Sequence, residues 1–372
     1  MCTAVEESGL DAVLTDDPGD VAYLTGFFHH PCERPVAIWI GTDGSTLMLL
    51  PELEREHAES QQAAADLVSY PEFPGVVPPF EHLAKAVTGL RVGHSTGMSW
   101  ARLDAVRAAF GDQELVPTDV VATARLVKAS EEVALHAEAG RITDLMLAAG
   151  RALVEQSVAD SGTLPSEAEL AGHVTAAGIE TMYAEHTGVV VVSPLAGGLV
   201  YAGENSAYPH GLPSGYRLRP GDTFMLSLGC AVGGRFVEGE RTFVLGSPTP
   251  EQRRYHDIVA QAQHRGAEAI RPGRSCADVN RMCLDVIREA GLGEFLRHRQ
   301  GHGIGLGMHE PPWLEDGDET LLAPGMIVSN EPGIYVRGHA GYRISDSMLV
   351  TDDRAASFTH YPRSLEDCTI PL

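Results

Sequence analysis

The sequence predicts an α+β protein of two domains, a smaller α/β domain over residues 1–125 and a larger domain over residues 126–372. Three observations lead to this fold class. A chain of 372 residues exceeds the roughly 100–200 residues of one domain. After the segment RLVKAS, a long helical periodicity replaces short apolar runs. Beyond that segment, short turns that contain Gly join several strands, which favours antiparallel pairing.

The first domain alternates short strands with turns and helices. Apolar runs predict strands at DAVLT, VAYLTGF, RPVAIWI and STLMLL, separated by the turn-forming segments DDPGD, HHPCE and GTDG. Helices are predicted over residues 52–65 and 79–89. This mixture is typical of an α/β domain with its own core.

The second domain opens with a long amphipathic helix, predicted over residues 131–156 with Ser130 as its N-cap. Further helices are predicted over residues 166–183, 250–271 and 275–290. Strands are predicted at GVVVVS, TFMLSLGCAV, RTFVLG, MIVSNEP and SMLVT. We therefore expect a mainly antiparallel sheet flanked by helices.

The charge balance excludes several classes of function. The chain has 27 Lys and Arg against 51 Asp and Glu, a formal net charge of −24, and no basic run. This argues against nucleic acid or an anionic membrane as a partner. No apolar stretch approaches the ~20 residues of a membrane span, and the N-terminus is acidic where a secretory signal is basic. We expect a cytoplasmic protein that acts on a small molecule.

Residues with catalytic potential gather in four strings of the second domain. These are AYPHGLP, LSLGCAVGGRFVEGERTF, RHRQGHGIGLGMHEPP, and MIVSNEPGIY followed by GYRISDSMLV. The segment GHGIGLG lacks the GK[ST] ending and the βαβ context of a phosphate loop, which disfavours nucleotide binding. Taken singly, His302, His309 and Glu331 fit structural roles. The evidence for a site lies in their combination.

Together and in this order, the strings resemble the pita-bread superfamily of methionine and Xaa-Pro aminopeptidases and creatinase. The resemblance covers essentially the whole chain. It implies a creatinase-type N-terminal domain, a C-terminal pita-bread domain with an antiparallel sheet flanked by helices, and a homodimer or larger assembly.

The peptidases of this superfamily bind two divalent metals through two Asp, one His and two Glu. The matching positions in this chain are Ser227, Glu238, His302, Glu331 and Ser345. Serine is a poor ligand for divalent ions, and the loss of two carboxylates leaves about two positive charges uncompensated. The resemblance therefore predicts a protein that binds no metal and needs no cofactor.

What remains of the pattern resembles creatinase, the metal-independent member. Its LSL strand matches residues 226–228, and its Glu-Arg-Thr matches residues 240–242. The resemblance assigns His210 as general base and then general acid, with Glu240 and Glu331 as catalytic residues that grip the substrate. The expected substrate-binding residues are Arg34, Glu238, His302, His309 and Trp313. Arg34 is expected to reach the partner's site across a homodimer.

The acidic residues favour a cationic substrate. Without metals, Glu238, Glu240 and Glu331 would form an acidic pocket that a guanidinium or amidinium group could neutralise. Trp313 stands where creatinase uses a second carboxylate-binding Arg, so a substrate other than creatine is expected. The leading hypothesis is therefore metal-independent hydrolysis of a non-peptide C–N bond in a small guanidino or amidine compound.

Two other functions stay open. One is an Xaa-Pro-type metallopeptidase with a degenerate metal site, supported by His298, His302 and His309 at the spacing that the peptidases use for proton transfer and substrate contact. The other is a catalytically inactive pita-bread domain used for binding, as in histone-chaperone subunits of this fold. Metal content and the turnover of a His210→Ala variant separate the three hypotheses.

Overall fold

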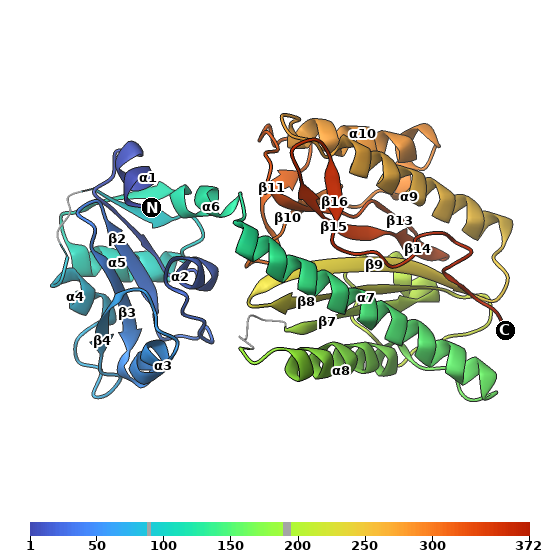
Figure 1. Cartoon of the computed structure of the whole chain (residues 1–372), viewed down its shortest axis with the longest axis horizontal. Helices are drawn as coiled ribbons and strands as arrows, with labels where there is room; N and C mark the ends of the chain where they lie inside the picture. The colour runs from blue at the N-terminus through green and yellow to red at the C-terminus, as the bar shows by residue number, and fades with distance from the viewer. Residues whose placement is uncertain (88–90, 189–194) are drawn as a thin grey trace. The chain divides into compact units, whose positions relative to one another are not determined.

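The computed structural model describes residues 1–87, 91–188 and 195–372. Two compact units share these residues, Met1–Arg125 and Leu126–Leu372 (Figure 1). Among the described helices, none combines the length and the apolar character that a membrane span requires.

The N-terminal unit is built on a mixed sheet. Its described strands have the order β4-β3-β2-β1-β5-β6, with antiparallel pairing from β1 through β2 to β3 and parallel pairing at β3–β4, β1–β5 and β5–β6. Along β1, Val13 packs into one apolar cluster and its neighbours Ala12 and Leu14 into another, so both faces of the sheet are covered. The strands are β1 (Ala12–Thr15), β2 (Ala37–Gly41), β3 (Thr46–Pro51), β4 (Asp66–Tyr70), β5 (Arg91–Ser95) and β6 (Glu114–Thr118). The helices are α1 (Cys2–Glu7), α2 (Pro18–Thr25), η1 (Glu52–Glu54), α3 (Arg55–Ser60), α4 (Pro79–Ala84), α5 (Trp100–Phe110) and α6 (Val120–Arg125).

Three predictions for this unit are wrong, one of them the helix predicted over residues 79–89, which ends at Ala84. The segment VAYLTGF, expected as a strand, lies largely in helix α2, because the Asp17 side chain accepts the Asp20 backbone N–H at 2.9 Å and Pro18 occupies the first helical position. Gly26 ends this helix in the left-handed conformation, with φ 76°. The helix predicted over residues 52–65 ends earlier, at Ser60, and the chain then enters β4.

The C-terminal unit is built on a sheet whose strands lie far apart in the sequence. Along the main path of the described residues the order is β11-β10-β12-β15-β9-β8-β7, with every pair antiparallel. Strand β16 joins β15, β17 joins β9, and β13 pairs with β14 in a separate hairpin. The strands are β7 (Ala196–Ala202), β8 (Thr223–Val232), β9 (Arg235–Leu245), β10 (Gly301–Gly303), β11 (Glu310–Leu314), β12 (Ile327–Asn330), β13 (Gly333–Val336), β14 (Ala340–Arg343), β15 (Ser345–Val350), β16 (Ala355–Ser357) and β17 (Thr369–Ile370).

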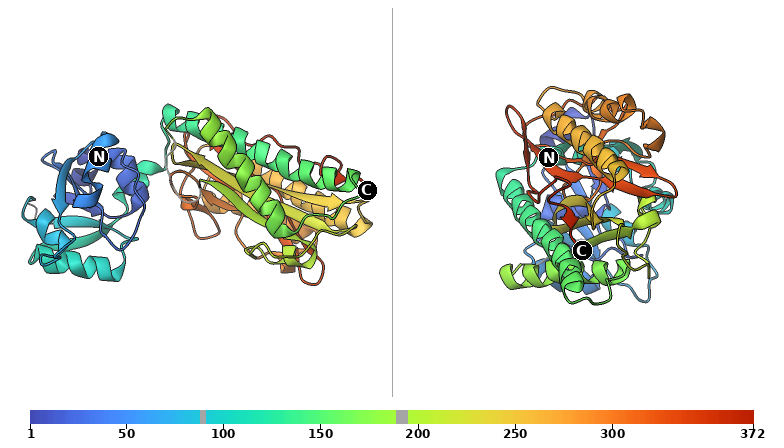
Figure 2. Two further views of the ribbon diagram at one scale, coloured as in Figure 1. Left: turned by 90° about the horizontal axis from the view of Figure 1, so that it is seen from below. Right: turned by 90° about the vertical axis from the view of Figure 1, so that its right-hand side faces the viewer.

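Two pairs of helices cover this sheet. The pair α7 and α8 lies side by side against β7, β8 and β9, and the pair α9 and α10 packs on β11 to β14 (Figure 2). The helices are α7 (Ser130–Ala159), α8 (Glu167–Glu185), α9 (Pro250–Ala269) and α10 (Cys276–Glu289), with short turns η2 (Gly203–Ala207) and η3 (Gly293–Phe295). This arrangement confirms the predicted antiparallel sheet flanked by helices.

The structure corrects one helix boundary in this unit. Helix α7 begins at Ser130, and its N-cap is Ala129 instead of the predicted Ser130. The Ala129 backbone N–H donates to Glu132 Oε2 at 3.1 Å. A glutamate in the first turn thus accepts the hydrogen bond of the cap residue's backbone N–H. The strand predicted at GVVVVS, residues 188–193, falls almost wholly outside the described residues.

Candidate active site

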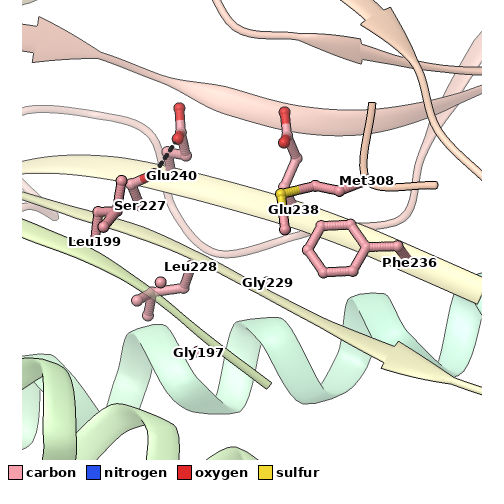
Figure 3. A pocket seen from close by; sticks show the side chains of 10 residues that line it. Gly197, Leu199, Ser227, Leu228, Gly229, Phe236, Glu238, Glu240 and Met308 are labelled. Carbon is pink, nitrogen blue, oxygen red and sulfur yellow. Dashed lines mark hydrogen bonds between the residues drawn. The ribbon is translucent and has the colours of Figure 1, made fainter. Parts of the chain in front are cut away.

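Two buried glutamates lie side by side on β9. Because side chains alternate along a strand, Glu238 and Glu240 point to the same face, as Figure 3 shows. The Ser227 hydroxyl on β8 donates to Glu240 Oε1, and the Ser345 hydroxyl on β15 donates to Glu238 Oε1 at 3.1 Å. The two serines that stand at metal-ligand positions of the family pattern therefore donate hydrogen bonds to glutamate side chains. We call Glu238, Glu240 and Glu331 the acidic cluster.

His302 brings the third carboxylate to this cluster. Glu331 is the residue that directly follows β12. The His302 Nε2 atom lies 3.2 Å from Glu331 Oε1 and 3.8 Å from Glu238 Oε2. Its Nδ1 atom donates to the Gly303 carbonyl at 3.0 Å, so a neutral ring carries its lone pair on Nε2, toward the carboxylates. This is the arrangement of a metal-binding histidine whose second nitrogen is fixed by a carbonyl.

The pKa values show that this half of the cluster has too little positive charge. Burial, and next the charge of Glu331, raises the pKa of Glu238 to about 8. Burial lowers the pKa of His302, but Glu238 and Glu331 outweigh it and raise that pKa to about 9. Burial likewise raises the pKa of Glu331, but the His302 ring outweighs it and lowers that pKa to about 2. One imidazolium thus serves two buried carboxylates.

The other half of the cluster has its own cation, Arg343 at the end of β14. Its Nε atom lies 2.5 Å from Glu240 Oε2, and one terminal nitrogen donates to Ser227 Oγ at 3.0 Å. The other terminal nitrogen donates to the Tyr335 hydroxyl at 3.0 Å, which in turn contacts His298 Nε2 at 2.8 Å. Only 4% of Arg343 is exposed, so this guanidinium is a fixed part of the site.

Two cavities border the acidic cluster. The first, about 370 Å³, is apolar apart from the carboxylates and Ser227 (Figure 3). Its lining is Gly197, Gly198, Leu199, Ser227, Leu228, Gly229, Phe236, Glu238, Glu240 and Met308. The second, about 250 Å³, is rich in histidine and arginine and is lined by His210, His298, Arg299, His302, His309, Glu315, Glu331 and Arg343. Glu238 and Glu240 line the first cavity while their partners His302 and Arg343 line the second, so the cavities share one border.

A set of metal-ligating groups lies at this border. One ligand atom each of Glu238, His302 and His309 lies within 4.8 Å of the others. The His302 and His309 rings are 4.1 Å apart, and burial together with His302 lowers the pKa of His309 to about 4, which keeps this ring neutral. One carboxylate and two imidazoles suit zinc and similar divalent ions. The excess negative charge and the orientation of His302 Nε2 fit such an ion.

Comparison with known proteins identifies the family. Residues 134–352 match the model of metallopeptidase family M24, and residues 2–127 match the creatinase/prolidase N-terminal domain. The chain belongs to metallopeptidase family M24. It is therefore a peptidase by family, and its larger unit is the pita-bread domain that the sequence predicted.

Several similar proteins match this chain over nearly the whole length of both chains. The Xaa-Pro dipeptidase of Lactobacillus delbrueckii subsp. lactis is 28% identical over 97% of this chain and 96% of its own. Among solved structures, dipeptidase PepE from Mycobacterium ulcerans has a TM-score of 0.86 and 29% identity, covering 100% of this chain and 96% of its own. The prolidase from Pyrococcus horikoshii OT3 has a TM-score of 0.84 and 26% identity, with 98% of each chain covered.

These findings overturn the leading functional hypothesis. The prediction of a metal-independent, creatinase-like hydrolase of guanidino or amidine compounds is wrong, because the family is one of metallopeptidases and the full-length relatives are dipeptidases and prolidases. That prediction assigned Glu238, His302 and His309 to substrate binding, whereas the structure groups them as candidate metal ligands. Hydrolysis of a C–N bond survives as the broader statement.

The structure divides the three residues predicted as catalytic between two cavities that share a border. His210 is exposed and lines the histidine-rich cavity together with Glu331. Glu240 lines the apolar cavity, and both of its carboxylate oxygens are engaged, by Ser227 and Arg343. Glu240 is thus a partner of Arg343 in this M24 protein, and its predicted grip on the substrate stays a prediction.

Two residues predicted to bind substrate have other partners. The guanidinium carbon of Arg299 lies 4.3 Å from the centre of the Trp313 ring on β11, so a cation of the protein itself stacks on this ring. Arg34 lies in the N-terminal unit and forms ion pairs with Glu33, at 3.0 Å, and with Glu72. Its role across a homodimer stays a prediction.

Sequence reasoning missed Arg343, Tyr335 and Arg299. All three stood inside the quoted strings, and the signal that could have exposed Arg343 is a charged residue within an otherwise buried strand, which requires a buried anionic partner. Asp346 next to Ser345 does not replace a ligand. It points to the opposite face of β15, where Arg241 and Arg363 pair with it at 2.9 and 2.5 Å.

Proposed function

We propose that this M24 protein is a dipeptidase of the Xaa-Pro type that hydrolyses small peptides with a divalent metal held by Glu238, His302 and His309. The observation that carries the proposal is this donor group, two buried residues and the exposed His309 at the border of two cavities, in a metallopeptidase chain. Similarity to an Xaa-Pro dipeptidase and a prolidase over nearly the whole chain supports the substrate class.

The chain's own residues have distinct roles in such a reaction. A divalent ion supplies a polarised carbonyl and a water of lowered pKa. His302 presents Nε2 because Nδ1 is fixed by the Gly303 carbonyl. Glu331 Oε1 lies 3.2 Å from His302 Nε2, beside the donor group, and is the carboxylate oxygen that accepts a proton. His210 lines the same cavity and donates a proton to the leaving nitrogen.

The two cavities account for the two ends of a dipeptide. The apolar cavity, about 370 Å³ and lined by Leu199, Phe236 and Met308, accepts an apolar side chain or a proline ring. In the second cavity, Arg299 is held over Trp313 and paired with Glu315 at 2.8 Å, where it can bind a free carboxylate. The peptide bond then lies at the acidic cluster between them.

Peptide hydrolysis before and after chelation tests this proposal. The protein is stripped with a chelator, reloaded with Mn²⁺, Co²⁺ or Zn²⁺, and assayed on Leu-Pro and Ala-Pro beside Leu-Ala and Ala-Ala, with creatine as the non-peptide control. We expect chelation to abolish hydrolysis of Xaa-Pro dipeptides and reloading to restore it. Hydrolysis that resists chelation, or none of any peptide with any of the three metals, would contradict the proposal.

The carboxylate contact has a matched substrate pair. In an Arg299→Met variant we expect KM for Leu-Pro to rise about tenfold, because one charge-assisted contact is lost, with little change for Leu-Pro-amide. An equal rise for both substrates would show that Arg299 does not bind the carboxylate.

A further inference from the structure

We infer that the ion pair of Arg343 with Glu240 takes the place of a second metal ion, so that the site binds a single divalent ion. The inference deepens the proposed function and rests on it. It concerns the Glu240 side of the acidic cluster, next to Ser227. It departs from the two-metal site that the family resemblance implied.

The first argument is that the space beside Glu240 is already occupied by a cation. Arg343 Nε lies 2.5 Å from Glu240 Oε2, and its two terminal nitrogens donate to Ser227 and Tyr335 at 3.0 Å each. A second metal ion at Ser227, the first of the five positions in the two-metal pattern, would have to displace this guanidinium. Displacement would leave a buried cation without its carboxylate, which costs several kcal/mol.

The second argument is charge balance. With all three carboxyl groups ionised, as binding of a cation requires, the acidic cluster carries three negative charges, of which Arg343 balances one and a single divalent ion balances the other two. The nearby Arg299 pairs with Glu315 at 2.8 Å, and Asp346 with its two arginines lies on the opposite face of β15. A second divalent ion would leave two uncompensated positive charges in a buried site.

The third argument concerns the two serines. Ser227 accepts a hydrogen bond from Arg343 and donates one to Glu240, so its hydroxyl is engaged in both directions. Ser345 donates to Glu238 Oε1 and orients that carboxylate, whose other oxygen lies 3.8 Å from His302 Nε2. Each serine thus supports a glutamate where the two-metal pattern has a carboxylate ligand.

A matched pair of variants on β9 tests the inference. Glu238→Gln and Glu240→Gln are isosteric changes two residues apart on the same face of the same strand. Each protein is stripped of metal, incubated with Mn²⁺ and freed of unbound ion by gel filtration. The bound Mn²⁺ per chain is then counted by mass spectrometry, and electron paramagnetic resonance distinguishes an isolated ion from an exchange-coupled pair.

We expect the parent chain to hold one Mn²⁺ with the spectrum of an isolated ion. Glu238→Gln should weaken Mn²⁺ binding by at least about 100-fold, and Glu240→Gln by less than about tenfold, because only the first removes a ligand. A charge-balanced double variant, Glu240→Gln with Arg343→Gln, should also keep one ion. Circular dichroism spectra establish that each variant is folded, and the parent count stands without any variant.

The failures are distinguishable. Two Mn²⁺ per parent chain with an exchange-coupled spectrum would overturn the inference and leave the proposed dipeptidase standing. Equal loss of Mn²⁺ in Glu238→Gln and Glu240→Gln would also overturn it. A parent chain that holds no Mn²⁺, Co²⁺ or Zn²⁺ would overturn the proposed function and the inference together.

Discussion

Glu238 and Glu240 occupy nearly equivalent positions and have different surroundings. Both are buried on the same face of β9, and each accepts a hydrogen bond from a serine on a neighbouring strand. Glu240 is neutralised by Arg343, whereas Glu238 shares the His302 ring with Glu331 and faces His309. The comparison teaches that the neighbouring cation, and not the carboxylate itself, decides which glutamate is available to a metal.

The largest expected effect breaks the Glu238 half of this comparison. In a His302→Ala variant we expect kcat/KM for Xaa-Pro dipeptides to fall at least about 1,000-fold, equivalent to about 4 kcal/mol, because a proposed metal ligand is lost. Steady-state kinetics with metal in excess measures it. The exposed His264 on α9 gives the control His264→Ala, which should retain parent activity. A loss below tenfold in His302→Ala would remove this residue from the proposed ligands.

The next effect concerns stability in the Glu240 half. An Arg343→Met variant leaves Glu240 buried without its cation, so we expect the free energy of unfolding to fall by about 3–5 kcal/mol. Urea denaturation measures this change. The double variant Arg343→Met with Glu240→Met removes both charges and should recover at least half of the loss. A single variant within about 1 kcal/mol of the parent would mean that the ion pair does not hold this part of the fold together.

A third expectation uses a buried histidine that contrasts with His302. Burial lowers the pKa of His136 to about 3, and no carboxylate outweighs that effect as Glu238 and Glu331 do for His302. In the unfolded chain the histidine pKa is near 6.5. Between that pH and about 3, the unfolded chain therefore binds a proton at His136 that the folded chain does not bind. Stability should fall as the pH drops below about 6.5, by at most about 1.4 kcal/mol per pH unit for this proton.

The matched variant for this effect is His136→Gln. Glutamine keeps an N–H donor for the Phe236 carbonyl, which His136 Nδ1 contacts at 2.8 Å, and it does not titrate. We expect the variant to lose less stability than the parent between about pH 6.5 and pH 4.5 in urea unfolding. Parallel pH dependences in the two proteins would assign the acid sensitivity to other groups.

The smallest expected effect lies beside the site. In a Trp313→Leu variant Arg299 loses its aromatic support, worth about 0.5–1 kcal/mol, so we expect KM for dipeptides to rise by a factor of about 2–5 with kcat unchanged. Steady-state kinetics separates the two constants. A lower kcat at constant KM would place Trp313 in the chemical step and not in the positioning of Arg299.

Long periodic segments made much of the fold predictable from the sequence. The helices α7, α8, α9 and α10 and the strands β8 and β9 have hydrophobic patterns long enough to reveal their type. Short elements were less predictable, as α2 shows, because its cap at Asp17 and the Pro at its first position decide the structure of an apolar run. The strands β10 and β13, of three and four residues, were not recognised because so short a segment carries little pattern.

The sequence showed which residues belong to the site but not which side chains pair with one another. The sequence indicated His302, Glu331, Glu238 and Glu240 as members of one site, and the structure brings them together. It could not show that Arg343 pairs with Glu240, because that contact joins strands more than a hundred residues apart and depends on side-chain direction. Without that partner, the three acidic residues suggested a pocket for a cationic substrate.

One measurement tests the central claim most directly. Crystals grown with Mn²⁺ give anomalous difference density that both counts and places the ions. We expect one peak per chain, in contact with Glu238, His302 and His309, with Arg343 still paired to Glu240. A second peak between Ser227 and Glu240, with Arg343 displaced, would contradict the single-ion site, and density without any peak at the acidic cluster would contradict the metal centre itself.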